Sequence, residues 1–212
     1  MKKVQLYSGG LDSYIISRLW KPDVKLYFDY GIPQNVEEMK HLPSDVIIKK
    51  INLSDYMQDD GLNTIPLRNL LFSAMAVNYG DVIAIGGLKS DLHYDKKPEF
   101  ATLATQLFNS VLEKERQPKT IQIVIPFAEY TKTDLICAFF EDGGTRDELE
   151  KNSWSCHTPV NGEPCGHCQA CKARNKAIIE AGILYVEKQK EKRQTINEIK
   201  KQYNLSNKDI NV

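Results

Sequence analysis

The sequence predicts a doubly wound α/β fold, in which helices cover both faces of a parallel sheet. Short runs rich in β-branched and aromatic residues recur along the chain, each about as long as a strand. Between them lie segments whose apolar residues are spaced by three and four, as in helices with one buried face. Strands that alternate with helices favour a parallel sheet. The runs are residues 4–7, 24–28, 46–51, 82–85 and 121–125.

The helical spacing and the composition also predict how the chain is divided. Spacing is clearest at Leu11, Ile15, Ile16 and Leu19 and at Leu70, Leu71 and Met75. From about residue 141 to 174 the pattern gives way to Gly, Pro, Asn and Cys, and residues 188–201 form a charged, helical tail. We expect a nucleotide-binding α/β domain at 1–145, a small four-cysteine zinc region at 146–183 and a helical tail at 184–212. Ligands should bind beyond the carboxyl ends of the strands.

The composition indicates an ordinary globular protein and argues against several other classes. The 212 residues include 28 acidic and 28 basic side chains, so the formal net charge is zero. The chain therefore lacks the excess of basic residues that would indicate direct binding to nucleic acid. No stretch approaches the roughly 18 uninterrupted apolar residues of a membrane helix, and the first glycines come before any apolar leader. We expect a cytoplasmic protein that acts on small molecules and contacts neither membrane nor nucleic acid.

A glycine turn with two serines and an aspartate follows the first predicted strand and opens the first predicted helix. Unpaired N–H groups at a helix N-terminus favour an anion, and two glycines let the backbone approach a phosphate. The hydroxyls can donate to phosphate oxygens, and Mg²⁺ beside a nucleotide would explain the carboxylate. No Gly-Lys-Ser/Thr follows, so this is not a kinase P-loop; a plain helix cap is the alternative. The turn comprises Ser8, Gly9, Gly10, Leu11, Asp12 and Ser13.

Four of the five cysteines fall within sixteen positions, in the pattern C-x8-C-x2-C-x2-C. Thiolates at such spacings can converge on one tetrahedral Zn²⁺, and a closed set of four leaves no open position for catalysis. We therefore predict a structural metal that holds a segment with little core of its own. An iron–sulfur cluster and free buried thiols are the alternatives. The predicted ligands are Cys156, Cys165, Cys168 and Cys171, whereas His157 and His167 are expected beside them and Cys137 in the core.

The glycine turn and the cysteine spacing together resemble the 7-cyano-7-deazaguanine synthase family of the PP-loop ATPase superfamily. Further segments are similar to that family's patterns and follow in the same order, from about residue 3 to residue 182. An ordered set of this kind is more specific than either terminal motif alone. The segments are Phe28-Asp29-Tyr30-Gly31, Pro66-Leu67-Arg68-Asn69, Asp95-Lys96-Lys97-Pro98-Glu99-Phe100, Pro126 with Thr131-Lys132-Thr133-Asp134, and Trp154-Ser155-Cys156.

The resemblance implies a fold like that of the adenine nucleotide alpha hydrolases, magnesium-dependent use of ATP, a structural zinc and a homodimer. It also implies a ligase of queuosine biosynthesis that converts 7-carboxy-7-deazaguanine and ammonia to 7-cyano-7-deazaguanine through an activated carboxylate and an amide. Nucleotide binding would then involve residues 8–13, Phe28 and Asp29, and catalysis Ser8, Asp12, Ser13, Arg68 and Lys132. Substrate binding would involve Arg68, Asn69, Asp95, Lys97 and Glu99, the carboxylates pairing with the guanine-like edge.

Two departures from the family's pattern bear on this chemistry. Ile32-Pro33-Gln34 stands where the family usually has Gln-Arg-His, so a basic residue and a histidine are missing near the expected nucleotide site. Lys97 stands where arginine is common, so a point charge replaces a planar fork of donors. Two other functions stay open: another PP-loop enzyme, such as a tRNA thiolase or an amidotransferase, and a non-catalytic nucleotide-binding zinc protein.

Overall fold

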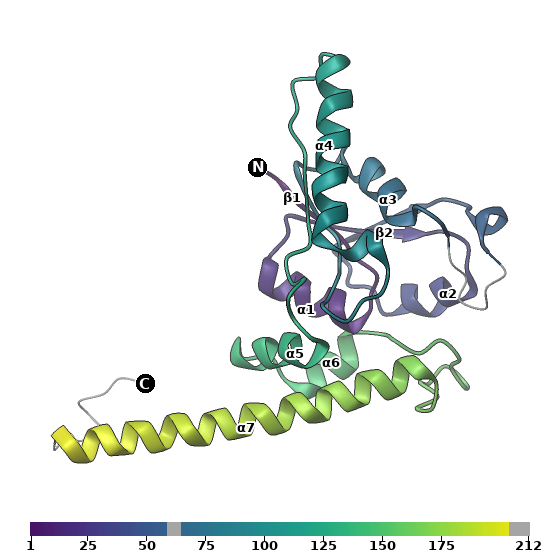
Figure 1. The fold of residues 1–212 in the computed structure, drawn as a ribbon. Coiled ribbons are helices and arrows are strands. Elements are labelled where there is room, and N and C mark those ends of the chain that lie inside the picture. The colour runs from purple at the N-terminus through teal and green to yellow at the C-terminus, as the bar shows by residue number, and fades with distance from the viewer. Residues whose placement is uncertain (59–64, 204–212) are drawn as a thin grey trace.

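The computed structural model describes residues 1–58 and 65–203, and its centre is a five-stranded sheet in the order β3-β2-β1-β4-β5 (Figure 1). Every neighbouring pair in the sheet is parallel. The bounds of the strands differ from the predicted runs by at most one residue at either end. The strands are β1 (Lys3–Leu6), β2 (Val24–Asp29), β3 (Val46–Lys50), β4 (Val82–Ala84) and β5 (Gln122–Val124).

Helices cover both faces of the sheet, which confirms the doubly wound class. In the apolar clusters, α3 and α4 pack on one face, whereas α1, α5, α6 and the start of α7 gather on the other. Figure 1 shows the two layers above and below the strands. The helices are α1 (Leu11–Trp20), α2 (Pro33–Lys40), α3 (Arg68–Ala76), α4 (Pro98–Lys114), α5 (Lys132–Glu141), α6 (Arg146–Asn152) and α7 (Gln169–Tyr203), with short 3₁₀ turns η1 (Ser54–Tyr56) and η2 (Tyr94–Lys96).

Successive residues of β1 face the two layers in turn, as the two-residue period of a strand requires. Val4 is fully buried in the cluster that contains Phe72 of α3 and Ala104 of α4. Gln5 is also fully buried and donates from Nε2 to the Ser13 carbonyl of α1 at 2.8 Å. This hydrogen bond ties the first turn of α1 to the central strand, directly behind the predicted phosphate-binding turn.

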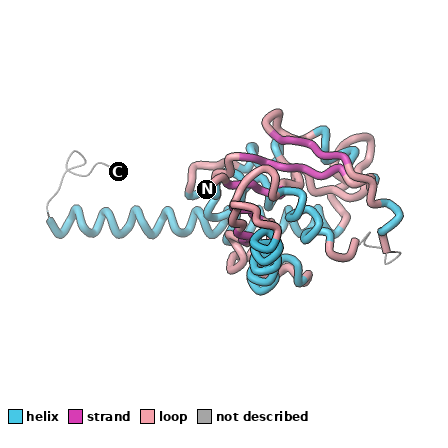
Figure 2. The backbone as a smooth tube through the Cα atoms, turned by 90° about the horizontal axis from the view of Figure 1, so that it is seen from above, coloured by secondary structure: helices cyan, strands magenta, loops and turns pink. Residues whose placement is uncertain are grey.

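The second layer joins segments that are far apart in the sequence. Ile15 of α1, Phe139 of α5 and Ala181 of α7 are all fully buried in one cluster. Beyond this contact α7 projects well past the body of the molecule (Figure 2). It continues without a break through residues 183 and 184, where the sequence suggested a boundary; the division into three parts stays a prediction.

Sequence reasoning missed α6, which lies in the stretch where no regular pattern was seen. The signal was present as a capping box, because the Thr145 hydroxyl accepts from the Glu148 backbone N–H at 3.2 Å and the Glu148 carboxylate accepts from the Thr145 N–H at 3.4 Å. Leu149 of this helix is fully buried. In the described part of the chain, no helix combines the length and the apolar character needed to cross a membrane.

Candidate active site and cysteine cluster

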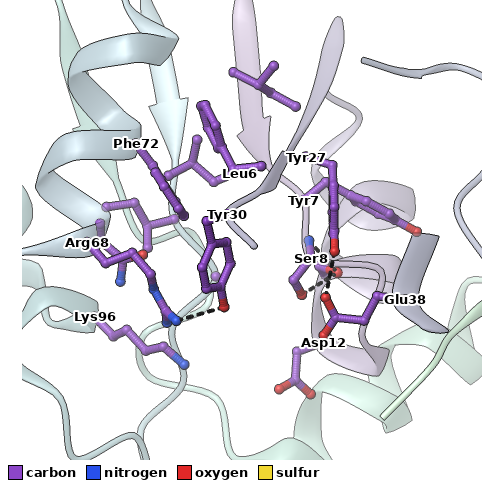
Figure 3. Close-up of a pocket in the computed structure, with 16 residues that line it drawn as sticks. Leu6, Tyr7, Ser8, Asp12, Tyr27, Tyr30, Glu38, Arg68, Phe72 and Lys96 are labelled. Atoms are coloured by element: carbon purple, nitrogen blue, oxygen red, sulfur yellow. Dashed lines mark hydrogen bonds between the residues drawn. The ribbon is translucent and has the colours of Figure 1, made fainter. Parts of the chain in front are cut away.

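A cavity of about 270 Å³ opens at the carboxyl ends of β1, β2 and β4 (Figure 3). The order in which strands are added reverses here, because β2 and β3 lie on one side of β1 and β4 and β5 on the other. Open parallel sheets bind ligands at such a switch point. The lining brings together several of the predicted residues, namely Ser8, Asp12, Ser13, Phe28, Arg68 and Asn69.

The predicted phosphate-binding turn, residues 8–13, is built around two glycines with different backbone conformations. Gly9 has φ 75°, in the left-handed region that favours glycine. Gly10 is the N-cap of α1, and because it has no side chain it cannot cap the first N–H groups of the helix, as an anion could. The Ser13 hydroxyl donates to the Gly10 carbonyl at 3.0 Å and lies 3.2 Å from the Ser8 hydroxyl. Both hydroxyls are therefore held at the N-terminus of α1.

Asp12 of this turn is paired with Lys132, the first residue of α5. The Lys132 Nζ lies 2.6 Å from both carboxylate oxygens. Thr131 fixes the start of α5, since its hydroxyl accepts from the Asp134 N–H at 3.1 Å. Both side chains of the ion pair are about one third exposed, at 34% for Asp12 and 31% for Lys132, and such a pair contributes only about 0–1 kcal/mol. Asp12 can thus exchange its lysine for another cation at little cost.

Glu38 of α2 lines the same cavity and was not predicted. Its Oε2 accepts from the Tyr27 hydroxyl at 2.8 Å and from the Asn35 Nδ2 at 3.2 Å, and Nδ2 also donates to the Tyr27 oxygen at 2.6 Å. Burial raises the pKa of the Glu38 carboxyl, although these two hydrogen bonds act in the opposite direction. The sequence alone could not single it out, because Glu37 beside it is the same type of residue. Only the structure shows that Glu37 instead pairs with Lys40, at 2.8 Å.

Arg68 and Lys96 form the opposite wall, across the cavity from Glu38 and Asp12 (Figure 3). The Arg68 guanidinium donates to the Tyr30 hydroxyl at 3.0 Å and stands 5.4 Å from the centre of the Tyr30 ring. Lys96 was not predicted as a site residue, whereas the predicted Lys97 does not line the cavity. The Lys97 Nζ instead donates to the Lys89 carbonyl at 3.2 Å. The segment before α4 thus does place a lysine at the cavity, but this lysine is Lys96 and not the predicted Lys97.

Asn69 is a fixed donor in the cavity wall. It is 8% exposed, and its Nδ2 has no hydrogen-bond partner among the described residues. A buried donor of this kind is costly unless something accepts from it. Asn69 therefore fits contact with an acceptor atom of a bound ligand.

Other predicted site residues lie outside the cavity lining. Asp29 accepts from the Gly31 N–H at 3.3 Å, at the end of β2. Asp95 is half-buried in η2, and Glu99 is exposed in the first turn of α4. Their assignments stay predictions. The side chains of Pro33 and Gln34, part of the departure from the family's pattern, lie outside what the structure describes, whereas the adjoining Ile32 is buried.

The four clustered cysteines converge as predicted. Their sulfur atoms all lie within 4.8 Å of one another. Backbone N–H groups point at three of the sulfurs, at distances of 3.3–3.4 Å, which favours thiolates. Several hydrogen bonds, the largest effect coming from the Thr158 hydroxyl, lower the pKa of the Cys165 thiol to about 5, whereas burial raises the pKa of Cys171 to about 12. The set fits a tetrahedral metal ion and could hold zinc.

The family described as "Queuosine biosynthesis protein QueC" matches residues 40–182. The chain belongs to this family. The match includes Arg68, Asn69 and the cysteine cluster and begins after the phosphate-binding turn. Relatives named 7-cyano-7-deazaguanine synthase extend the similarity. The protein of Prochlorococcus marinus is 29% identical over 82% of this chain and 92% of its own length. That of Trichodesmium erythraeum is 27% identical over 86% and 98%, and that of Leptospira interrogans 28% over 86% and 88%.

Membership of the QueC family agrees with the resemblance drawn from the motifs. The matches cover between 88% and 98% of the length of these relatives. QueC proteins are named for queuosine biosynthesis, and the family uses ATP. A cavity that combines a phosphate-binding turn with cations on the facing wall is consistent with that use.

Proposed function

We propose that this chain is an ATP-dependent ligase that converts 7-carboxy-7-deazaguanine and ammonia to 7-cyano-7-deazaguanine. One observation carries the proposal: the phosphate-binding turn and the pair Arg68 and Lys96 face each other across one cavity at the switch point of the sheet. The names of the relatives support the identity of the product. An anionic substrate and ATP both need the cations and N–H groups that this cavity offers.

The proposed route uses two activations. The substrate carboxylate attacks the α-phosphorus of ATP and releases pyrophosphate, and ammonia then displaces AMP to leave an amide. The amide oxygen then attacks the α-phosphorus of a second ATP, which releases pyrophosphate and one N–H proton, and loss of AMP together with the remaining N–H proton leaves the nitrile. Each step needs the reacting atoms in line and the charge on phosphate offset. Those requirements decide the roles assigned to the residues.

We assign phosphate binding to the N–H groups at the start of α1 and to the hydroxyls of Ser8 and Ser13. Asp12 would hold Mg²⁺, which offsets phosphate charge when bound. Lys132 would then leave Asp12 and approach the polyphosphate. The geometry supports this exchange, because both side chains are about one third exposed and the cost of separating the pair is small.

The planar base would lie against the aromatic wall of the cavity. Phe28 and Phe72 stack there with ring centres 4.3 Å apart. Glu38 can accept from the donor edge of a deazaguanine, because Tyr27 and Asn35 both contact Oε2 and leave Oε1 for a ligand. We therefore assign that edge to Glu38 ahead of Asp95 and Glu99.

The test is to incubate the purified chain with magnesium, ATP, ammonium and 7-carboxy-7-deazaguanine and to follow the base by mass spectrometry. We expect the amide to appear transiently and the nitrile to accumulate, with AMP and pyrophosphate formed in step. Arg68→Met should abolish turnover, whereas Arg146→Met, on the surface of α6, should not. Intact carboxylate with a folded, metal-loaded protein would favour a different PP-loop substrate, and failure to consume ATP at all would favour a non-catalytic nucleotide-binding protein.

Three further properties belong to the proposal. The cysteine cluster holds a structural zinc, supported by the convergence of its four sulfurs. Clustered cysteines that bind a metal instead of forming disulfides are typical of a reducing compartment, so the cytoplasm is the expected location. The homodimer is supported by the family resemblance and by the exposed apolar row Leu103, Leu107 and Val111 on α4. Metal analysis and light scattering test the first and last of these.

A further inference from the structure

We infer that Trp154 is a positioning residue that couples the cysteine cluster to the phosphate-binding turn. The inference concerns how the turn is held in its binding conformation, and it rests on the proposed function only in taking ATP as the ligand of that turn. The contacts that support it run from Gly9 through Trp154 to two of the clustered cysteines.

Trp154 contacts the turn directly. Its backbone N–H donates to the Gly9 carbonyl at 2.9 Å, and its own carbonyl lies 3.6 Å from the position that a Cβ on Gly10 would take. The Gly9 carbonyl and the Gly10 N–H belong to one planar peptide unit. A peptide between two glycines rotates easily, so the hydrogen bond from Trp154 fixes the direction in which this N–H of the turn points.

The cysteine cluster holds the other side of Trp154. The indole Nε1 donates to the Cys156 carbonyl at 2.9 Å, and the ring, 6% exposed, packs with Cys156 and Cys171. The His41 ring stacks on it with centres 4.5 Å apart and planes 8° from parallel. These contacts therefore hold the indole in one position as long as Cys156 and Cys171 stay in place.

Arg174 clamps the residues on either side of the tryptophan. Its guanidinium donates to the hydroxyls of Ser153 at 2.9 Å and Ser155 at 3.2 Å, and to the Leu149 carbonyl at 2.7 Å. Arg174 follows Cys171 by one turn of α7, so the two side chains lie on the same face of that helix. An anchor on Cys171 thus fixes Arg174, and with it the backbone of Trp154.

A metal ion held by the four sulfurs would therefore order the phosphate-binding turn from a distance. Without it, the segment that carries the cysteines has little apolar core of its own, and Cys156 and Cys171 are free to separate. Trp154 would then lose its packing against Cys156 and Cys171, and the Gly9–Gly10 peptide would no longer be held in one orientation. The sheet and its two apolar layers do not depend on these contacts, so the fold of the body should survive.

The experiment compares the whole chain, metal-loaded and chelator-treated, with the variants Trp154→Ala and Trp154→Phe. Hydrogen exchange of the peptide containing residues 8–13 reports the order of the turn, and calorimetry reports ATP affinity. We expect chelation to accelerate exchange and to weaken ATP binding about tenfold in the unmodified chain, the effect of losing one or two hydrogen bonds. Trp154→Ala, with all four cysteines intact, should bind metal and show part of this weakening without chelation, because it keeps the backbone N–H that contacts Gly9 but loses the indole that holds it in place. The phenylalanine variant, which keeps the stacking, should fall between Trp154→Ala and the unmodified chain.

Non-additivity is the decisive result. If the indole carries the coupling, chelation should affect the turn clearly less in Trp154→Ala than in the unmodified chain, the remaining effect passing through Arg174 to the backbone of residue 154. Additive effects, or an alanine variant with normal exchange and normal ATP affinity, would overturn the inference. Trp20→Ala, at the far end of α1 from the turn, is the matched control and should change neither measurement. A chain that binds no ATP would count against the proposed function, while the exchange data would still decide the coupling.

Discussion

Replacing Asn35 should both destabilise the fold and open the wall of the cavity. Asn35 is 1% exposed; its Oδ1 accepts from the N–H groups of Tyr30 at 3.1 Å and Ile32 at 3.4 Å, and its Nδ2 donates to Tyr27 and Glu38. Asn35→Ala leaves the N–H groups of Tyr30 and Ile32 without this acceptor and removes one of the two donors to Glu38, at about 1–3 kcal/mol for a fully unpaired group. With some replacement by water, we expect a loss of about 3 kcal/mol and a melting temperature lower by roughly 6–12 °C.

Chemical denaturation and calorimetric ATP binding provide the assay. Asn109→Ala is the matched control, because Asn109 makes two 2.8 Å hydrogen bonds to the backbone of Ile121, away from the cavity. It should lower stability without changing ATP affinity, whereas Asn35→Ala should lower both. The stability of Asn35→Asp should be lower at neutral pH than at acidic pH. The new carboxylate faces Glu38, so the pKa values of both carboxyl groups rise in the folded state and their ionised forms destabilise it. A loss below about 0.5 kcal/mol for Asn35→Ala would refute this account of the turn.

Three other predictions concern single residues of the site. Gly9→Ala should weaken ATP binding more than Gly10→Ala, measured by calorimetry, because φ 75° at Gly9 costs an L-residue about 1–2 kcal/mol; equal losses would contradict this. Lys132→Met should lower the melting temperature only slightly, since both side chains of its pair with Asp12 are about one third exposed. It should reduce pyrophosphate release at least about tenfold, because the cation proposed to approach the polyphosphate is lost. Burial raises the pKa of Glu38, so its ionised form costs stability as pH rises above the ordinary value of 4.5. Glu38→Gln should therefore melt higher than the unmodified chain at neutral pH, with the difference disappearing in melts near pH 4, and should bind the base less tightly.

Much of the site could be predicted because its signals are local. A glycine turn between a strand and a helix defines a phosphate site within six residues, and four cysteines in a short segment can reach one another in almost any fold. The sulfur atoms do converge, and Ser8, Asp12 and Ser13 do line one cavity. Period and composition likewise predicted each strand, because short runs of β-branched residues are typical of strands, even of the edge strand β3, in which no residue is buried.

Other features depend on directions and contacts that no local pattern contains. Lys96 and Lys97 are adjacent and chemically alike, and only the turn before α4 decides that Lys96 lines the cavity. Glu38 reaches the cavity because α2 packs beside β2, where Tyr27 can donate to it.

By itself the sequence determined the fold class, the place of the glycine turn at the first strand-to-helix junction and the convergence of the cysteines, because periodicity, glycine conformation and ligand spacing act over a few residues. The tertiary structure alone decided which charged side chains share the cavity and that Trp154 meets Gly9, 145 positions away in the chain. Contacts of that separation depend on how whole layers pack, and packing is a property of the assembled chain.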